Sequence, residues 1–219
     1  MAASSSSTFA PSQTTVEYFE SLYADAHGDA ARIPWVDRRP QPALINWLNA
    51  VAPSLIRCGS RVAVIGCGLG DDARELMRRG YEVTAFDCSR TAVEWAKKID
   101  PANAQCYFQA DLFDPPGRWR HRFDLVVEIN NIQSLMPDLH ERAIAAIANL
   151  LSPNGHLLVI CRGCDEPAGP DDGPPWALTE GELLEAATCA GLVLAVPLCK
   201  FDDEETPPVR RMRALFRRA

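Results

Sequence analysis

The sequence predicts an α/β fold in which strands and helices alternate around an open, mostly parallel sheet. Short apolar runs that suit strands buried on both faces alternate with segments of helical periodicity. The first run, residues 61–65, ends in a glycine-rich turn that leads straight into a helix. The 219 residues, of which 47% are hydrophobic and 23% charged, can bury one sizeable core. We therefore expect one folded domain.

The N-terminal part of the chain differs from this pattern. It starts with a stretch rich in Ser, Thr and Ala that contains no acid, where we predict a disordered tail. Apolar residues at helical spacing then predict helices over residues 16–23 and 44–51, with a loop between them. The predicted boundaries are residues 1–15 for the tail and 16–219 for a single domain, divided into a helical part, 16–52, and a core, 61–219.

The core elements follow in order along the chain. Strands are predicted over residues 61–65, 82–86, 106–109, 123–129 and 156–161, and helices over residues 71–79, 91–99 and 137–151. Gly80 suits a left-handed C-cap for the first of these helices, and residues 153–155 suit a turn. A further helix should begin at Thr179, because Glu182 three residues later completes a capping-box spacing.

The C-terminal segment predicts two strands, over residues 192–199 and 209–216, joined by an acidic hairpin loop. Five arginines lie in the last eleven residues: Arg210, Arg211, Arg213, Arg217 and Arg218. Apolar residues alternate with them, so we predict that these arginines make an edge strand soluble. Without them the chain, whose net charge is −7, is strongly acidic, which argues against partners such as nucleic acid or anionic membrane.

The cysteines and apolar runs bear on the location of the protein. We interpret the eight cysteines as reduced structural thiols, since most lie in apolar stretches. Cys161 and Cys164 form one C-x-x-C pair, a weak zinc or redox signal without a second pair, and we predict no metal site. There is neither an apolar run of about 20 residues nor a secretory signal, so a cytoplasmic protein is expected.

The glycine-rich turn predicts a nucleotide site. Gly66-Cys67-Gly68-Leu69-Gly70 lies between a buried strand and a helix, where open α/β sheets bind nucleotides. Asp71 and Asp72 follow in the first turn of that helix, where they would repel a pyrophosphate but could receive an ammonium group. The last position of the dinucleotide fingerprint is occupied by Asp71 instead of glycine, which disfavours NAD.

Polar residues also end the next strands. Asp87 stands 17 residues after Gly70, near the spacing at which an acid binds ribose hydroxyls. Asp111 follows the third strand and could accept a hydrogen bond from an adenine amino group. The fourth strand ends in Glu128 and then Asn130-Asn131, which suit either a substrate site or a polar turn that caps a helix.

Together these motifs resemble a class I methyltransferase that uses S-adenosylmethionine. The resemblance rests on residues 62–70, 81–87, 110–113, 123–127 and 150–158. It implies a Rossmann-like class I methyltransferase fold, with a seven-stranded, mostly parallel sheet, an antiparallel C-terminal strand and helices on both faces. It also implies S-adenosyl-L-methionine as cofactor, S-adenosyl-L-homocysteine as product, and a lid formed by the N-terminal helices.

The resemblance assigns site residues as well. The glycine turn would hold the methionine part of the cofactor, Asp87 the ribose, and Asp111 and Leu112 the adenine. The cofactor candidates are Gly66, Cys67, Gly68, Gly70, Asp87, Cys88, Asp111, Leu112 and Glu128. The acceptor candidates, in the lid and after the fourth strand, are Trp35, Arg38, Asn130, Asn131, Gln133, His27 and His140.

A narrower resemblance concerns the acceptor. The leader Pro34-Trp35-Val36-Asp37, residues 89–94 and Gly173-Pro174-Pro175 are similar to the small thiol, thiopurine and tellurite-resistance methyltransferases. Those enzymes usually have a glycine where Arg38 or Arg39 stands. The two arginines suit either pairing with an acidic substrate or a solvated surface.

We therefore predict methyl transfer to a small molecule, with a thiol sulfur as the first acceptor, since a thiol is partly ionised near neutral pH. An O- or N-methyltransferase of a secondary metabolite is the alternative. From other classes, an NAD-dependent oxidoreductase and a catalytically idle nucleotide-binding module remain open. The chain lacks the Asn/Asp-Pro-Pro-aromatic motif of nucleic-acid amine methyltransferases after the fourth strand, so no nucleic-acid or membrane partner is expected. It should be a monomer or homodimer.

Overall fold

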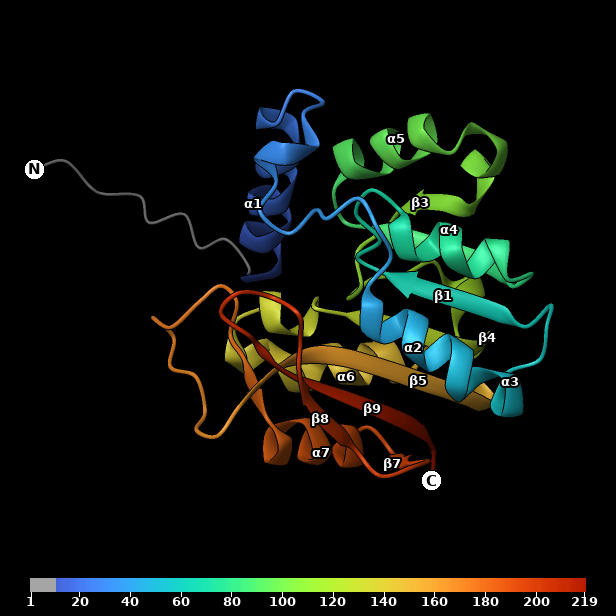
Figure 1. The fold of residues 1–219 in the computed structure, drawn as a ribbon, viewed down its shortest axis with the longest axis vertical. Coiled ribbons are helices and arrows are strands. Elements are labelled where there is room, and N and C mark those ends of the chain that lie inside the picture. Colours follow the sequence, from blue (N-terminus) through green and yellow to red (C-terminus); the bar gives the residue numbers. More distant parts are fainter. Residues whose placement is uncertain (1–10) are drawn as a thin grey trace, which may run out of the picture.

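The computed structural model describes the backbone from residue 11 and the side chains from residue 15 to the C-terminus (Figure 1). The predicted disordered tail over residues 1–15 lies mostly outside the described residues. Its last part is helical, because helix α1 (Pro11–Asp25) begins before the predicted first helix. The division into one domain with two parts stays a prediction.

A twisted sheet forms the centre of the molecule, in the order β3-β2-β1-β4-β5-β9-β7. These strands are β1 (Arg61–Ile65), β2 (Glu82–Asp87), β3 (Tyr107–Gln109), β4 (Phe123–Ile129), β5 (Leu151–Cys164), β7 (Leu192–Leu194) and β9 (Arg210–Arg218). Two short strands lie off this path: β6 (Leu178–Thr179) pairs with β5, and β8 (Cys199–Asp202) pairs with β9. Strands β1 to β5 are parallel to one another, and β9 is antiparallel to its neighbours. This arrangement confirms the predicted fold class.

Helices cover both faces of the sheet. They are α2 (Pro42–Ala50), α3 (Ala52–Leu55), α4 (Asp71–Arg78), α5 (Arg90–Ile99), α6 (His140–Ala148) and α7 (Glu180–Cys189). Short 3-10 turns lie at η1 (Ala30–Arg32), η2 (Pro101–Cys106), η3 (Gly117–Trp119), η4 (Ile132–Ser134) and η5 (Pro137–Leu139). Among the described residues, no helix is both long and apolar enough to cross a membrane.

Alternation along the strands divides the core into two layers. In β1, Val62 and Val64 pack with helices α2 to α5, whereas Ala63 and Ile65 face the layer that contains α6 and α7. A third, smaller cluster joins the N-terminal helix to the core through Tyr23 and other buried side chains. The sheet is thus covered on both faces, and only its strand ends are free to form a site.

Local signals in the sequence set several boundaries as predicted. Gly80 follows α4 with φ of 85°, the left-handed conformation that glycine adopts without steric cost. Thr179 caps α7, with its hydroxyl accepting from the Glu182 N–H at 3.1 Å while the Glu182 carboxylate accepts from the Thr179 N–H at 2.8 Å. This pair is the capping box expected from the sequence.

The C-terminal strands differ from the prediction. The predicted strand over residues 192–199 is interrupted, so that β7 and β8 pair with successive parts of β9. Strand β9 is therefore not an edge strand, because β5 occupies its other side. Arg211 in β9 is buried, with 5% of its surface exposed, so the prediction that it solubilises an edge was wrong.

Strand β5 also begins earlier than predicted. Residues 153–155 were expected to form a turn before the strand, but they lie within β5. The pairing with β4 shifts there, from Phe123–Leu151 to Leu125–His156, so these residues form an irregular bulge. Gly155 fits because a Cβ would lie 2.5 Å from the Phe123 carbonyl oxygen.

Candidate active site

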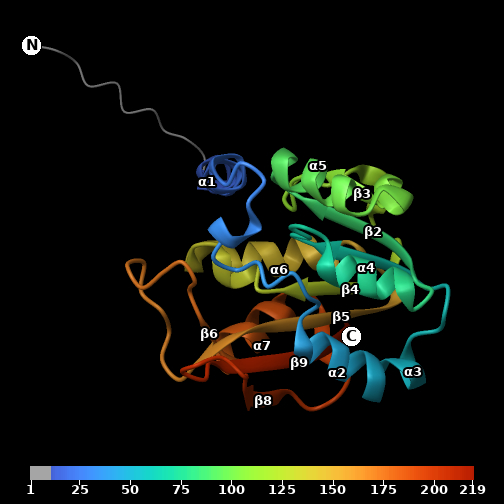
Figure 2. The same cartoon turned by 45° about the horizontal axis from the view of Figure 1, so that its top comes forward.

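A cavity of about 920 Å³ opens at the carboxyl ends of the parallel strands. In Figure 1 these ends point toward α1, and Figure 2 shows α1 and the segment after it lying over them. The walls come from the N-terminal helix and leader, the glycine turn, the ends of β2 and β3, the loop after β4, the Pro174–Pro175 segment and the β8–β9 hairpin. Segments far apart in sequence thus enclose one space at the switch point where α/β folds bind ligands.

The glycine turn is shaped by its neighbours. Gly66 and Gly68 line the cavity and have φ of 54° and 50°, which side-chain-bearing residues adopt at a cost. A Cβ on Gly66 would lie 1.7 Å from the Asn131 side-chain oxygen. Gly70 does not line the cavity; it begins α4 beside the ring of Tyr107, where a Cβ would lie 2.7 Å away. Gly70 thus packs against Tyr107, and its contact with the cofactor stays a prediction.

Asp87 joins the end of β2 to the glycine turn. Its Oδ2 accepts from the Gly68 N–H and its Oδ1 from the Ser89 N–H, both at 2.9 Å. Burial raises the pKa of this carboxyl. Each carboxylate oxygen can accept more than one hydrogen bond, so the side chain can also receive hydroxyl groups from the cavity that it lines.

Further predicted cofactor residues lie at the same end. Cys67, Cys88, Asp111 and Leu112 line the cavity. Burial raises the pKa of both thiols, so they stay protonated and act as small packing groups rather than nucleophiles. The Asp111 Oδ1 accepts from the Phe113 N–H at 2.9 Å, which fixes the turn after β3.

Asp72 connects the leader to α4. Its Oδ1 accepts from the Gln41 N–H at 2.7 Å, and burial raises its pKa to about 6. Asp71 instead pairs with Arg74 in the next turn of the helix. Both acids line the cavity beside the glycine turn, which keeps this end negative and unsuited to a pyrophosphate.

The N-terminal helix is held in place by Glu20, which sequence reasoning missed. The Glu20 carboxylate accepts from the Ser89 hydroxyl at 2.7 Å and from the Thr91 hydroxyl and N–H at 2.5 and 3.1 Å. It thereby caps α5 from another element. The only sequence signal was an acid on an otherwise apolar helical face, which did not indicate a partner 69 residues away.

Aromatic side chains form the lid above the cavity. Phe19 and Trp35 meet edge to face with ring centroids 5.7 Å apart, and the Trp35 indole N–H donates to the Tyr23 hydroxyl at 3.2 Å. All three line the cavity. The structure thus brings Trp35 to the site, as the sequence predicted.

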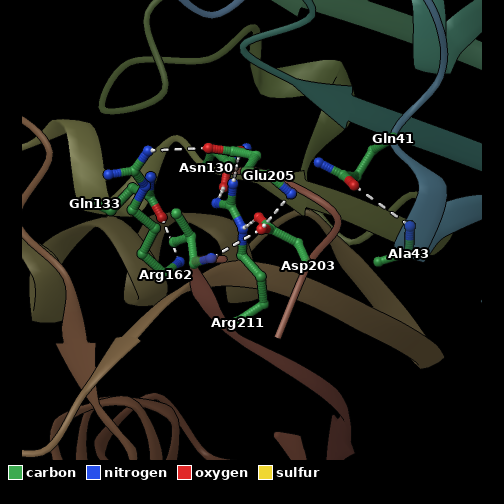
Figure 3. Close-up of polar contacts among 9 residues, drawn as sticks. Gln41, Ala43, Asn130, Gln133, Arg162, Asp203, Glu205 and Arg211 are labelled. Atoms are coloured by element: carbon green, nitrogen blue, oxygen red, sulfur yellow. Dashed lines mark hydrogen bonds and ion pairs between the residues drawn. The ribbon is translucent and has the colours of Figure 1, made fainter. Parts of the chain in front are cut away.

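Arg211 organises the opposite wall, as Figure 3 shows. Its Nε donates to Asp203 at 2.6 Å, its Nη2 to Glu205 at 2.7 Å, and its Nη1 to the Asn130 Oδ1 at 3.1 Å. Glu205 also lies 3.9 Å from Arg162. One buried guanidinium therefore fastens the β8–β9 hairpin to the loop after β4.

Glu128 supports that loop from below. Its Oε1 accepts from the N–H groups of Asn131 and Ile132 at 2.6 and 3.0 Å, while its Oε2 is buried without a hydrogen-bond partner among the described residues. Burial raises its pKa to about 7. Glu128 does not line the cavity and supports the loop from beneath, and its contact with the cofactor stays a prediction.

The loop after β4 brings three predicted residues to the cavity: Asn130, Asn131 and Gln133. The Asn131 side-chain N–H group donates to the carbonyl oxygens of Ile65 and Ile129, both at 2.9 Å, which ties the ends of β1 and β4 together. Its Oδ1 stays beside Gly66 at the cavity surface.

Three other candidates lie elsewhere. Arg38 and His27 are exposed, have positive φ and lie outside the cavity lining. His140 begins α6, where its Nε2 lies 3.0 Å from the Leu135 carbonyl oxygen and burial lowers its pKa. Arg39, unlike Arg38, does line the cavity.

Comparison with known proteins shows what the central segment resembles. Residues 62–155 match the family model described as a methyltransferase domain. This segment of the chain is thus similar to methyltransferase domains. The matched segment runs from β1 into β5, so it includes the glycine turn, Asp87 and the loop after β4.

Curated relatives match over part of their length. The ubiquinone biosynthesis O-methyltransferase of Alkalilimnicola ehrlichii is 28% identical over 138 residues, 59% of this chain and 55% of that protein. The tRNA N(3)-cytidine methyltransferase METTL2 of Danio rerio is 28% identical over 45% of this chain and 31% of its own. The chain thus spans about half the length of the first relative and about a third of the second.

Solved structures show that the methyltransferase fold extends over the whole described chain. The 1,6-didemethyltoxoflavin-N1-methyltransferase of Burkholderia thailandensis, solved with its substrate and S-adenosylhomocysteine, superposes with a TM-score of 0.75, 22% identity and coverage of 100% and 94% of the two chains. The magnesium protoporphyrin IX methyltransferase of Synechocystis gives 0.69, 15% identity, and 96% and 99% coverage. The architecture is that of the class I enzymes.

Proposed function

We propose that the protein is an S-adenosylmethionine-dependent methyltransferase that acts on a small molecule. The observation that carries this proposal is the hydrogen bond from the Gly68 N–H to Asp87, which unites two predicted cofactor contacts in one wall of the cavity. The methyltransferase relatives and the bound S-adenosylhomocysteine of a structural neighbour support it.

The residues present fit this cofactor. Asp87 has oxygen lone pairs for ribose hydroxyls, and Asp111 with Leu112 suits the adenine. Gly66 and Gly68 line the cavity without side chains, so a ligand can approach the backbone of the turn. Asp71, Asp72 and the free Asn131 Oδ1 make this end favourable to an ammonium group. When bound, S-adenosylmethionine supplies a methyl group on a positively charged sulfur.

The cavity then needs to align the acceptor and exclude water. Among its described lining residues there is no histidine, and both lining thiols have raised pKa values. Alignment by the lid and the β4 loop is therefore the main contribution of the protein, since an in-line displacement is accelerated by orientation and a shielded site.

The acceptor atom is a finer question. The relatives named above transfer methyl groups to oxygen and nitrogen according to their names, and the thiol predicted from the sequence stays a prediction. We propose a small organic acceptor that enters between the aromatic lid and the Arg211 wall. An NAD-dependent oxidoreductase is disfavoured by the acids that follow the glycine turn.

Calorimetry tests the proposal. S-adenosylhomocysteine should bind with micromolar affinity and NADH should not. Asp87→Ala should weaken S-adenosylhomocysteine binding at least tenfold, because each charge-assisted hydrogen bond to ribose contributes about 1.5–3 kcal/mol. Asp138→Ala, an exposed acid outside the cavity, is the control. Preference for NADH, or unchanged affinity in a folded Asp87 variant, would contradict the proposal.

A further inference from the structure

Three amide side chains that line the cavity share one feature: each has its oxygen engaged by the protein (Figure 3). The Gln41 Oε1 accepts from the Ala43 N–H at 3.3 Å, and the Asn130 Oδ1 accepts from Arg211 at 3.1 Å. The Gln133 Oε1 accepts from the Arg162 N–H at 2.5 Å. Because every partner is a donor that cannot accept, chemistry alone fixes which way each amide faces.

The amide nitrogens are thereby left for the cavity. All three residues line it, and none of the three NH₂ groups has a hydrogen-bond partner among the described residues. Gln133 is only 4% exposed. These NH₂ groups are therefore available to donate to a ligand in the cavity. The donors come from the start of α2 and from the loop after β4, so they approach the ligand from two sides.

The charges around these donors disfavour an anionic acceptor. The leader and the hairpin contribute the acids Asp37, Asp202, Asp203, Glu204 and Glu205 to the cavity wall, against the cations Arg39, Arg162 and Arg211. Arg211 is already neutralised by its two carboxylate partners. A carboxylate or phosphate would meet this acidic hairpin, whereas a neutral group would not.

The aromatic lid favours a flat ligand. Phe19 and Trp35 line the cavity with an edge-to-face arrangement that leaves ring surface available to a flat ligand. Pro174 and Pro175 line the same cavity and add rigid apolar surface. An aliphatic acceptor could accept hydrogen bonds from the donors but would leave the ring faces unused.

We propose that the acceptor is a neutral, planar heterocycle whose ring carbonyl oxygens or ring nitrogens accept hydrogen bonds from Gln41, Asn130 and Gln133. This inference rests on the proposed function, because it names the class of substrate for the same cavity. The thiol prediction concerns the atom that receives the methyl group. This inference concerns the neighbouring groups of the acceptor that the protein recognises.

Two isosteric variants test these donors. Gln133→Glu and Asn130→Asp keep the oxygen that accepts from Arg162 or Arg211 and replace only the cavity-facing NH₂ with an oxygen. The matched controls are Gln105→Glu and Asn149→Asp, which are exposed and outside the cavity. Each protein is first saturated with S-adenosylhomocysteine, whose binding reports on the proposed function separately.

The probes are lumazine, uracil and 2-pyridone as neutral heterocycles, with phenethylamine and benzoate as charged aromatic controls. We expect a heterocycle to bind and to shift the side-chain NH₂ resonances of Asn130 and Gln133, and each isosteric variant to lower its affinity at least tenfold. Binding of no heterocycle, tighter binding of phenethylamine or benzoate, or equal affinity in variants and controls would overturn the inference. Retained S-adenosylhomocysteine binding in any of those cases would leave the proposed function standing.

Discussion

The two ends of the cavity are built in different ways. At the cofactor end, the central contact joins Gly68 to Asp87, which are 19 residues apart and follow adjacent strands. At the acceptor end, Asn130 meets Arg211 across 81 residues of sequence. The first end uses backbone groups and strand order, whereas the second uses side chains from distant segments. Changes at one end should therefore leave the other intact.

The largest effect is expected from Arg211→Met. Removal of the guanidinium leaves Asp203 and Glu205 without their buried partner, which should lower the free energy of unfolding by about 3–5 kcal/mol. Urea denaturation measures this loss. S-adenosylhomocysteine affinity should change less than twofold under native conditions, while Arg213→Met on the same strand serves as control. Loss of cofactor affinity equal to that of an acceptor probe would show that the ends are coupled.

Gly66→Ala should have the next largest effect, at the cofactor end. The new Cβ would lie 1.7 Å from the Asn131 Oδ1 at a φ of 54°, so the turn or the β4 loop must move. We expect calorimetry to show about 100-fold weaker S-adenosylhomocysteine binding, or about 2.8 kcal/mol. Gly117→Ala, where a Cβ meets no atom within 4 Å, should bind normally. Normal binding by both variants would mean that this turn does not contact the cofactor.

Glu128 lies between the two ends, and its effect should depend on pH. Burial raises its pKa from 4.5 to about 7, so the folded state retains a proton that the unfolded state loses. Its contribution to stability is thus complete below pH 4.5 and is lost as the pH rises to about 7, at up to about 1.4 kcal/mol per pH unit. Urea titrations from pH 5 to 8 should show a shallower decline for Glu128→Gln. Parallel curves would refute this role.

Glu20→Gln should produce the smallest effect. Burial raises the pKa of Glu20, but hydrogen bonds from Thr91 and Ser89 outweigh it and lower the pKa, so the carboxylate is charged. Replacing it should loosen α1 and weaken S-adenosylhomocysteine binding about fivefold, or about 1 kcal/mol. Stopped-flow measurements should show faster release of S-adenosylhomocysteine from this variant. Glu17→Gln, an exposed acid on the same helix, should behave as the unaltered protein.

The sequence predicted the cofactor end better than the acceptor end for a physical reason. Strand ends, glycine turns and helix caps are set by residues near one another, so β1, β4 and the capping box at Thr179 were found. Arg211 carried no such signal, because its role depends on β9 lying between β5 and β7.

The lack of local sequence signals for distant contacts also explains why some candidates lie outside the cavity lining. His140 and Arg38 were chosen because their segments border the acceptor in similar enzymes, but side-chain direction depends on local turns and packing. Glu20 was missed because a capping acid that belongs to another helix leaves no spacing pattern. The amide orientations of Gln133 and Asn130 likewise required knowledge of their donors.

The position of β9 has a consequence for how the chain folds. This strand, Arg210–Arg218, is synthesised after its partners, and it pairs with β5 on one side and with β7 and β8 on the other. Until it inserts, the nascent protein exposes an open edge of β5, a template for misassociation with other chains. A chain cut before Arg210 would therefore keep the parallel strands β1 to β5 but lose the pairing partner of β5 and the contact of Arg211 with Asn130.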